Sequence, residues 1–419
     1  MTAPDSTPST FLPAVPANVL PGPPERLLAL RARFASLPDL RMPGRVLHRL
    51  PDVLLIALCA MLSDGDCFTD MESFAQTQIP WLRTFMDLPH GAPSHDVFRN
   101  VFMALDPAAL MAVMQEWCGP LEGAHVRIDG QTLRGSDRPA TGAGAVHLLR
   151  AYVHERGISA GHAPCAAHEN ELSTLPALLD ALVLRGATVT IDAMACQPPI
   201  VERLQQGGAH YLIALKANQK GARAAVRTHF EELESALCAP RAVLPATHHR
   251  HETTARRHGR YERRILTATA ALEWFDKSWK WAGRRSVVHV ERITARNGAA
   301  ESLSRESFYY LSSLEPGAGA LAALVRSHWA VESQHWVLDM TFGEDHSQVR
   351  DHTAARNLSV LRELSAAVLR RRAPPPHPEE EPALPAQTRR AGPCLPSPAS
   401  RPCLPLSPAW CVSPGLEGN

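Results

Sequence analysis

The sequence of 419 residues predicts an α/β protein with a mixed sheet and flanking helices, interrupted by a partly β insertion and preceded by an α-helical domain. Three observations predict this class. Residues 26–120 carry helix signals throughout. Residues 125–217 show three successive strand patterns and then helix and strand in alternation. Residues 218–313 are charged, mostly lack helical periodicity and contain further strand-like stretches.

The two ends of the chain are rich in proline. Residues 1–25 contain seven prolines, and residues 373–419 contain thirteen prolines and three of the nine cysteines. Such compositions cannot bury enough apolar surface to offset the entropy cost of folding, so both tails are expected to be disordered. The folded part is then a helical domain over 26–120 and an α/β domain over 121–372.

The helical domain shows clear start signals. An apolar stretch opens at Leu50-Pro51-Asp52 and runs to Leu62, and a second helical pattern covers Thr69 to Ala75. Ser94 is expected to be the N-cap of a helix that contains Val97 to Met103. Ser94-His95-Asp96 has the residue types of a hydrolase triad, but consecutive side chains cannot converge on one another.

The α/β domain follows from side-chain periods of two for strands and 3.6 for helices. Strands are predicted at 126–129, 146–153, 158–165, 187–192 and 211–216, and helices at 174–184 and 199–206. The insertion over about 218–313 is predicted to hold a helix at 223–237 and strands at 265–269, 286–293 and 308–312. Helices are then expected at 318–342 and, with one apolar face, at 353–372.

Overall composition limits the class of protein. A formal net charge of +1 excludes a uniformly basic protein, so any nucleic-acid surface must come from local segregation of charge. The longest apolar run, 53–62, is too short to span a bilayer, and residues 1–24 lack a signal-peptide pattern. Cysteines without a CxxC pair fit reduced thiols. A soluble cytoplasmic protein with no membrane partner is expected.

Three acidic residues stand out. Asp129 and Asp192 each follow a short β-branched run that predicts a strand, and Glu332 lies on a predicted helix. Carboxylates brought together in this way form a hard, all-oxygen site for Mg²⁺, which binds through one or two carboxylates and substrate phosphates. The chemistry indicated is metal-dependent cutting of a phosphodiester.

Each acid also has a plainer interpretation. Asp129 before Gly130 could be an ordinary turn former, and Glu332 could belong to a solvated charged stripe with His328, His335 and Asp339. Asp192 ends a strand where a buried charge would be costly, which favours a compensating metal or cation.

Basic residues suggest where DNA would bind. Residues 248–264 contain six arginines against two glutamates and are interpreted as a phosphate-facing surface, the alternative being a solvated loop. The candidate DNA contacts are Arg134, Lys216, Asn218, Lys220, Arg250, Arg256, Arg257 and Arg260. For Lys216, Asn218 and Lys220 the alternative is capping of a sheet edge. Trp329 and Trp336 could stack on an extruded base, although packing of their helix is expected for at least one of them.

Several segments, in order along residues 35–370, together resemble the ISAs1-type insertion-sequence transposases. They are Asp129-Gly-Gln-Thr-Leu-Arg-Gly-Ser, Asn170-Glu171-Leu, Thr190-Ile-Asp-Ala-Met-Ala-Cys-Gln, Tyr211-Leu-Ile-Ala-Leu-Lys-Ala-Asn-Gln, His258-Gly-Arg-Tyr-Glu, Tyr309-Tyr-Leu-Ser-Ser-Leu, and His328-Trp-Ala-Val-Glu with His335-Trp-Val-Leu-Asp.

The resemblance implies an RNase H-like catalytic core over 121–372, with a triad formed by Asp129, Asp192 and Glu332. It also implies two Mg²⁺ ions, for which Mn²⁺ is expected to substitute, and cleavage and joining of DNA strands by in-line displacement. The domain over 26–120 would bind the terminal inverted repeats of double-stranded DNA. A homodimer on DNA and a location at the bacterial nucleoid are expected, without a small-molecule substrate.

Two departures from the family pattern affect activity. The segment after Glu332 is one residue shorter, which rotates His335 by about 100° around the helix. Val325, His328 and Asp339 do not match the Tyr, Arg and Lys of related transposases, so no phosphate-contact role is carried over to them.

After Arg372 the sequence loses its periodicity, which suggests a frameshifted tail, the alternative being a native disordered one. Two other functions therefore remain open: a decayed transposase that only binds DNA, and a domesticated nuclease that cuts without joining strands.

Overall fold

The computed structural model describes residues 25–138, 144–153, 155–166, 170–257, 260–296, 303–329 and 331–370. Both predicted tails lie almost entirely outside these residues. The described chain forms two compact units: the first contains residues 25–195, 203–210 and 326–370, and the second contains 196–202 and 211–325.

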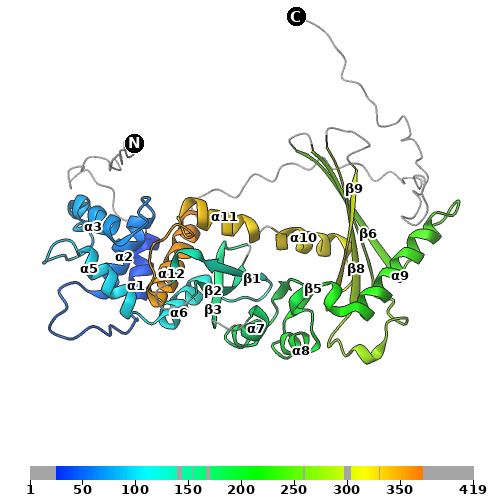
Figure 1. Ribbon diagram of the computed structural model, residues 1–419, viewed down its shortest axis with the longest axis horizontal. Coiled ribbons are helices and arrows are strands. Elements are labelled where there is room, and N and C mark those ends of the chain that lie inside the picture. Colours follow the sequence, from blue (N-terminus) through cyan, green and yellow to red (C-terminus); the bar gives the residue numbers. More distant parts are fainter. Residues whose placement is uncertain are drawn as a thin grey trace, which may run out of the picture. The chain divides into compact units, whose positions relative to one another are not determined.

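The first unit begins with helices, as predicted (Figure 1). They are α1 (Glu25–Phe34), α2 (Leu50–Met61), α3 (Phe68–Thr77), α4 (Ile79–Leu82), α5 (His95–Ala104) and α6 (Pro107–Cys118). α2 is buried along almost its whole length because its residues are nearly all apolar. Ser94 holds the N-cap position of α5 but makes no side-chain cap bond. Glu72 serves instead, its Oε2 accepting from the backbone N–H of His95 at 2.9 Å.

The last described helix, α12 (His352–Arg370), lies against these helices although it follows them by more than 200 residues (Figure 1). It packs against α2, α5 and α6 and also against strands β2 and β3. The predicted helix with one apolar face is therefore buried on almost all sides, including Asn357, Arg362 and Glu363. Asn357 Nδ2 donates to two carbonyls at the end of α5, at 2.8 and 2.9 Å.

The mixed sheet of the first unit confirms the predicted fold class. Its strands are β1 (His125–Leu133), β2 (Val146–Val153), β3 (Ile158–Cys165) and β4 (Thr188–Ile191), in the order β3-β2-β1-β4. β1, β2 and β3 are antiparallel neighbours, whereas β4 runs parallel to β1. β5 (His210–Leu215) begins beside β4, because the N–H of His210 donates to the carbonyl of Ala187 at 2.8 Å. This is the strand arrangement of an RNase H-like core.

Helices accompany this sheet. α7 (Glu171–Asp180) packs on β2 and β3, and α8 (Pro198–Gln206) follows β4. The helix predicted at 318–342 is two helices, α10 (Ala318–Trp329) and α11 (Val331–Thr341), and α11 packs on β1. The helix predicted at 174–184 begins three residues earlier, because the Asn170 side chain caps it by accepting from Ser173 N.

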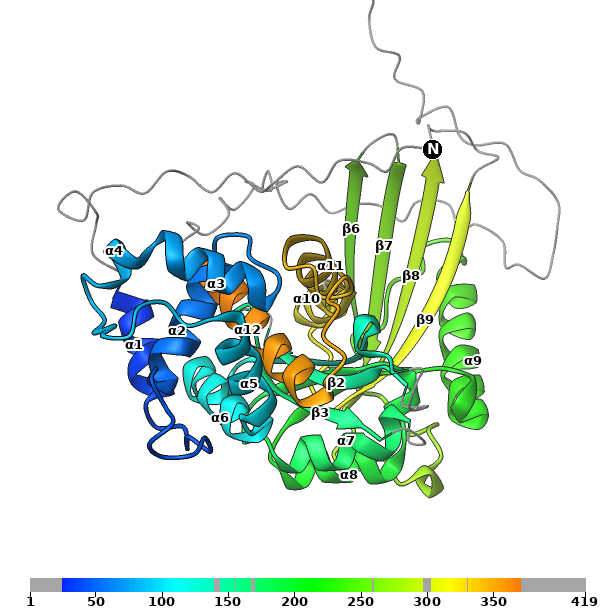
Figure 2. The same ribbon diagram turned by 60° about the vertical axis from the view of Figure 1, so that its left-hand side comes forward.

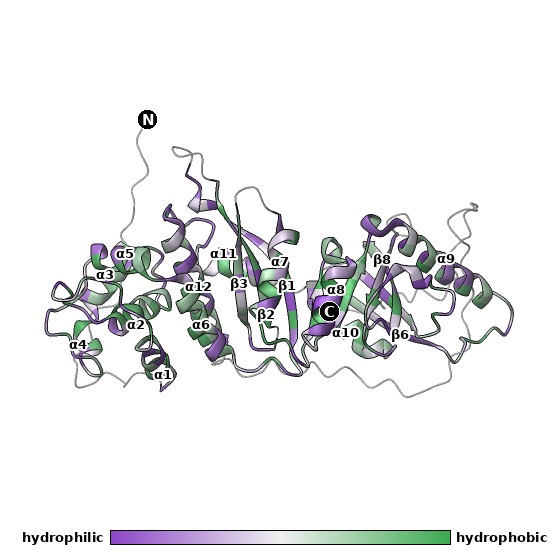
Figure 3. Ribbon diagram, turned by 90° about the horizontal axis from the view of Figure 1, so that it is seen from below, coloured by the Kyte–Doolittle hydropathy of each residue, from purple (hydrophilic) through white to green (hydrophobic). Residues whose placement is uncertain are grey.

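The second unit is a sheet in the order β5-β9-β8-β7-β6 with helix α9 (Lys220–Leu237). Figure 2 shows β6 (His248–Arg257), β7 (Arg260–Thr269), β8 (Ser286–Arg296) and β9 (Ser304–Ser312) side by side. The basic stretch 248–264 is thus a strand pair and not a loop, because its residues pair in register from His248 opposite Thr269. Figure 3 shows hydrophilic and hydrophobic residues mixed along these strands.

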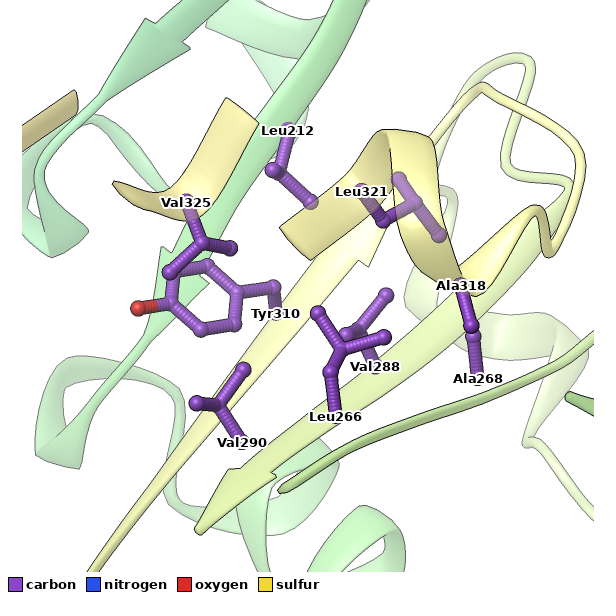
Figure 4. Packing of buried hydrophobic residues seen from close by; sticks show 9 residues of the cluster. All are labelled: Leu212, Leu266, Ala268, Val288, Val290, Tyr310, Ala318, Leu321 and Val325. Carbon is purple, nitrogen blue, oxygen red and sulfur yellow. The ribbon is translucent and has the colours of Figure 1, made fainter. Parts of the chain in front are cut away.

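The second unit has an apolar core where α10 covers its sheet (Figure 4). Leu321 and Val325 of α10 pack against Leu266 of β7, Val288 of β8 and Tyr310 of β9. These side chains are at most 7% exposed. Burial of this kind contributes roughly 25 cal/mol per Å² of apolar surface, so the core gives α10 a fixed place on the sheet.

Among the described residues, no single helix is long and apolar enough to cross a membrane. α5 and α6 reach that length only together and are bent by 89° at their junction.

Candidate active site

Asp129 and Asp192 occupy adjacent positions on neighbouring parallel strands. β1 and β4 pair with Ile128 opposite Ile191, and the two aspartates are the next residues on each strand. Parallel strands lie about 4.8 Å apart, so the carboxylates start from neighbouring backbone positions. Both aspartates are partly exposed. The fold thus joins two acids that are 63 positions apart in the sequence (192 − 129).

Asp129 does not end its strand. β1 continues to Leu133, and Gly130 is paired with Leu149 of β2. The interpretation of Asp129-Gly130 as a turn is therefore wrong, because β2 extends alongside these residues and provides a pairing partner. Asp192 follows the last residue of β4, as expected.

The third acid, Glu332, is the second residue of α11. Its side chain lies outside the described part of the chain, but contacts before and after it place its backbone. Ser327 Oγ is 2.8 Å from His125 Nδ1, and His335 Nδ1 is 3.9 Å from Asp129 Oδ2. The two contacts occur in the same order along β1 as along α10 and α11, and α11 packs on β1. Glu332 lies between these two contacts.

Asp192 directly follows β4, and a residue of that strand contacts both β1 and α10. Thr190, two residues earlier on β4, has its Oγ1 2.8 Å from His125 Nε2 and 3.0 Å from His328 Nδ1 of α10. Thr190 therefore points toward β1 and α10, and Asp192 comes directly after the strand that carries it. The structure therefore sets Asp129 beside the end of β4 that Asp192 follows, and α11, whose second residue is Glu332, packs on β1.

Two titratable residues of α11 extend the site along β1. Burial, reinforced by the charge of Arg150, lowers the pKa of His335 to about 4, so its contact with Asp129 at neutral pH is not an ion pair. Burial, with nearby Asp345 and Glu344, raises the pKa of Asp339 to about 6. Gln131 Nε2 donates to Asp339 Oδ1 at 3.3 Å.

A buried arginine connects the site to α12. Arg150 of β2 pairs with Asp129 in the strand register and is 3% exposed. Its Nη1 donates to Gln131 Oε1 at 2.6 Å and its Nη2 reaches Glu344 at 3.0 Å, while its Nε is 3.4 Å from Glu363 of α12. Burial disfavours its charge, but Glu344 and Glu363 outweigh this cost and raise the pKa of Arg150.

A second buried arginine is unsatisfied. Arg127 lies on β1 between His125 and Asp129, with no exposed surface. Within the described residues none of its three side-chain nitrogens has a hydrogen-bond partner, and its guanidinium lies 5.3 Å from the centroid of the Tyr152 ring. Burial lowers the pKa of Arg127 to about 10, which leaves it charged at neutral pH.

Sequence reasoning did not single out Arg127 and Arg150. The signal was the one used for Asp192: each is a charged residue inside an apolar strand run, Val126-Arg-Ile and Leu149-Arg-Ala. A charge at such a position needs compensation or a function.

The predicted DNA contacts fall in both units. In the first unit Arg134 directly follows β1, is 79% exposed at its side chain and lies 3.3 Å from Asp345 Oδ2. In the second unit Lys216, Asn218 and Lys220 are exposed where β5 leads into α9.

The four arginines of β6 and β7 that were predicted to contact DNA differ from one another. Arg250 is paired with Glu234 and also donates from Nε to Thr267 at 3.1 Å, so part of the expected basic surface is neutralised. Arg256 is exposed. Arg257 and Arg260 face each other in the strand register, and their side chains lie outside the described residues.

Two aromatic residues were expected near the site. The side chain of Trp336 on α11 is 61% exposed, so it does not pack the helix onto the sheet. The side chain of Trp329 lies outside the described residues.

The donor set suits a hard cation. Asp129 and Asp192 offer only carboxylate oxygens, the ligands that Mg²⁺ prefers, and Mg²⁺ often uses only one or two protein carboxylates. No group of three His, Cys, Asp or Glu side chains that could hold a metal occurs within the ranges that the structure describes, which exclude the Glu332 side chain.

Comparisons with known proteins identify the family of this chain. The family model described as "DDE_Tnp_1-associated" matches residues 31–118, and the model described as "Transposase DDE domain" matches residues 123–369. "Putative transposase YncI" of Escherichia coli O157:H7 is 31% identical over 348 residues, covering 80% of this chain and 86% of that protein. "H repeat-associated putative transposase YhhI" of E. coli K12 is 29% identical over 352 residues, covering 82% and 90%.

Among solved structures, the piggyBac transposase synaptic complex with hairpin DNA covers 83% of this chain and 82% of its own. Its TM-score of 0.33 and identity of 12% are too low to carry an argument. The family model that covers more than half of the chain, and the full-length relatives, show that the chain belongs to the DDE transposase family.

Proposed function

We propose that this chain is the transposase of an insertion sequence, which binds the terminal inverted repeats of its element and cleaves and joins DNA strands. The observation that carries the proposal is the pairing of β1 with β4, which sets Asp129 beside Asp192. Glu332 is proposed as the third acid, since its helix runs over the same strand.

Asp129, Asp192 and Glu332 would hold two Mg²⁺ ions, with Mn²⁺ able to substitute. When bound, these ions supply Lewis acidity that activates the attacking oxygen and stabilises the leaving oxygen of an in-line displacement. The protein's own part is to hold the carboxylates in place through β1, the end of β4 and helix α11. His335 of α11 lies beside Asp129, with its Nδ1 3.9 Å from Asp129 Oδ2.

DNA would be bound by the helical segment 26–120 and by exposed basic residues, of which Arg134 lies closest in sequence to an acid of the site. Transposition needs two ends held together, so a homodimer on DNA is part of the proposal. The protein would work in the bacterial cytoplasm at the nucleoid.

The test uses a labelled duplex carrying the inverted repeats that flank the gene, with Mg²⁺ and the full-length chain. We expect cleavage and strand joining by the wild type. Asp192→Asn should lower the cleavage rate at least about 1,000-fold, or about 4 kcal/mol, while a gel shift shows unchanged binding.

The other outcomes separate the alternatives. Binding without cleavage by the wild type would indicate a decayed transposase, and cleavage without joining would indicate a nuclease. Full Mg²⁺-dependent activity in Asp192→Asn would remove Asp192 from the site.

A further inference from the structure

Glu171 lies against the backbone of the residue that follows Asp129. A Cβ atom on Gly130 would be 2.0 Å from Glu171 Oε1 and 2.8 Å from His147 Nε2, so no side chain fits at position 130 without displacing both. Gly130 is in a strand and not in a turn. Glycine at position 130 therefore leaves room for the Glu171 carboxylate of α7 to lie against the backbone of β1.

The Glu171 carboxylate is held in place by a short chain of hydrogen bonds. His147 Nε2 is 2.8 Å from Glu171 Oε1, and His147 Nδ1 is 2.8 Å from Thr132 Oγ1. Because an ionised carboxylate only accepts, Nε2 carries the proton. Nδ1, on the other side of the ring, is hydrogen-bonded to the Thr132 hydroxyl. Thr132 and His147 are partners in the β1–β2 register, so the chain of bonds is anchored on both strands.

The N-terminus of α7 fixes where Glu171 begins. Asn170 caps the helix by accepting from Ser173 N at 3.0 Å, which makes Glu171 its first residue. A negative charge in the first turn is favoured by the helix dipole. The Asn170-Glu171 pair, one of the segments that resemble known transposases, thereby gains a structural explanation.

β1 is thus contacted from both faces at the acid. Successive strand residues point to opposite faces, so Asp129 turns toward His335 of α11 while position 130 turns toward Glu171 of α7. We propose that Glu171 is a positioning residue that holds this part of β1 and so sets the direction of the Asp129 carboxylate for metal binding. This inference rests on the proposed function, because it requires Asp129 to be a metal ligand.

The test is Mn²⁺ binding by the full-length protein, measured from the loss of the EPR signal of free Mn²⁺. Removing a group that orients a metal ligand weakens metal affinity about 10-fold or more. We expect about that loss for Glu171→Ala. Glu171→Gln should stay close to wild type, because its amide oxygen can accept the same bond from His147. Gly130→Ala should lose at least as much as Glu171→Ala, since its Cβ displaces the carboxylate.

Asp180→Ala is the matched control, because Asp180 is an exposed acid at the other end of α7 that pairs with Arg203. It should leave Mn²⁺ affinity unchanged. Mn²⁺ affinity equal to wild type in folded Glu171→Ala would overturn the inference, and so would an equal loss in Glu171→Ala and Asp180→Ala. The Mg²⁺ concentration for half-maximal cleavage should rise in parallel with the loss of Mn²⁺ affinity.

Two further variants keep the outcomes distinct. If Glu171→Ala fails to fold, His147→Leu removes the donor that orients the carboxylate and should weaken Mn²⁺ binding in the same direction; unchanged affinity there overturns the inference. Asp129→Asn tests the proposed function separately. If it binds Mn²⁺ as the wild type does, the metal site itself is wrong, whatever Glu171 does.

Discussion

The sheets of the two units carry their charges in opposite ways. In the first unit Arg127 and Arg150 are 0% and 3% exposed and lie in the strand layer beside the acids. In the second unit the charges of the long strands form partly exposed cross-strand pairs, such as Arg263 with Glu252 and Arg292 with Glu306. Burying a charge costs several kcal/mol, whereas an exposed pair contributes about 0–1 kcal/mol.

This difference shows which of the two sheets carries its charges at a cost in stability. An apolar residue in place of Arg127 would complete an ordinary sheet core, whereas Arg150 neutralises two buried glutamates. Both arginines belong to a buried polar layer that costs stability. The exposed pairs of the second unit are what any solvated antiparallel sheet carries. Buried charge therefore distinguishes the unit that carries the proposed site better than the number of basic residues does.

The largest expected effect compares one arginine from each sheet. Arg150→Met should destabilise the protein by about 3–5 kcal/mol, because it leaves Glu344 and Glu363 buried without their partner. Arg263→Met removes an exposed partner of Glu252 and should cost no more than about 1 kcal/mol. Urea unfolding of both variants measures the contrast. Equal losses in the free energy of unfolding would show that the buried and the exposed arginine contribute alike to stability.

Most of the fold was predictable because side-chain period reflects burial directly. The predicted strands 146–153 and 158–165 match β2 and β3 residue for residue. β6 was missed because its sequence, His-His-Arg-His-Glu-Thr-Thr-Ala-Arg-Arg, is polar throughout and shows no apolar alternation. Pairing with β7 overrides local composition there. The near-complete burial of α12 could not be predicted from its own sequence, since it depends on helices more than 200 residues away.

The candidate site was predictable only in part. Asp129 and Asp192 could be selected because each interrupts strand character with a charge, but their adjacency depends on the register between β1 and β4. The contact of Glu171 with Gly130 depends on where α7 begins relative to β1. No spacing in the sequence encodes that distance, which explains why Gly130 was interpreted as a turn residue.

A smaller effect of the opposite sign is expected at Arg127. Arg127→Met keeps a similar volume and removes a buried charge that lacks a hydrogen-bond partner within the described residues, so it should stabilise the protein by about 1–2 kcal/mol. This net value already includes a loss of about 1 kcal/mol, because the substitution also removes the cation–π contact with the Tyr152 ring. Thermal and urea unfolding measure the change. A loss of stability would mean that Arg127 has a compensating partner.

Asp339 should give a still smaller, pH-dependent effect. Burial raises the pKa of Asp339 to about 6, so between about pH 4 and 6 the folded protein binds a proton that the unfolded chain has released. The contribution of this group to stability therefore falls as pH rises through that window. Asp339→Asn should match wild type near pH 4 and exceed it at pH 7 by less than about 1 kcal/mol, because solvent screens a partly exposed group. Identical pH profiles for the two proteins would contradict the raised pKa.

The smallest expected effect tests the basic hairpin of the second unit. Arg256 is exposed, whereas Arg250 is already paired with Glu234 and bonded to Thr267. If the hairpin contacts phosphates, Arg256→Ala should reduce the slope of log affinity against log salt by about 0.9, the contribution of one phosphate contact. Arg250→Ala should leave the slope unchanged, and Glu234→Gln, which frees Arg250, should steepen it. Fluorescence anisotropy with labelled DNA at several salt concentrations measures all three slopes. Equal reductions for Arg250→Ala and Arg256→Ala would show that the ion pair with Glu234 opens on DNA, so that the paired charges of this sheet are available for binding after all.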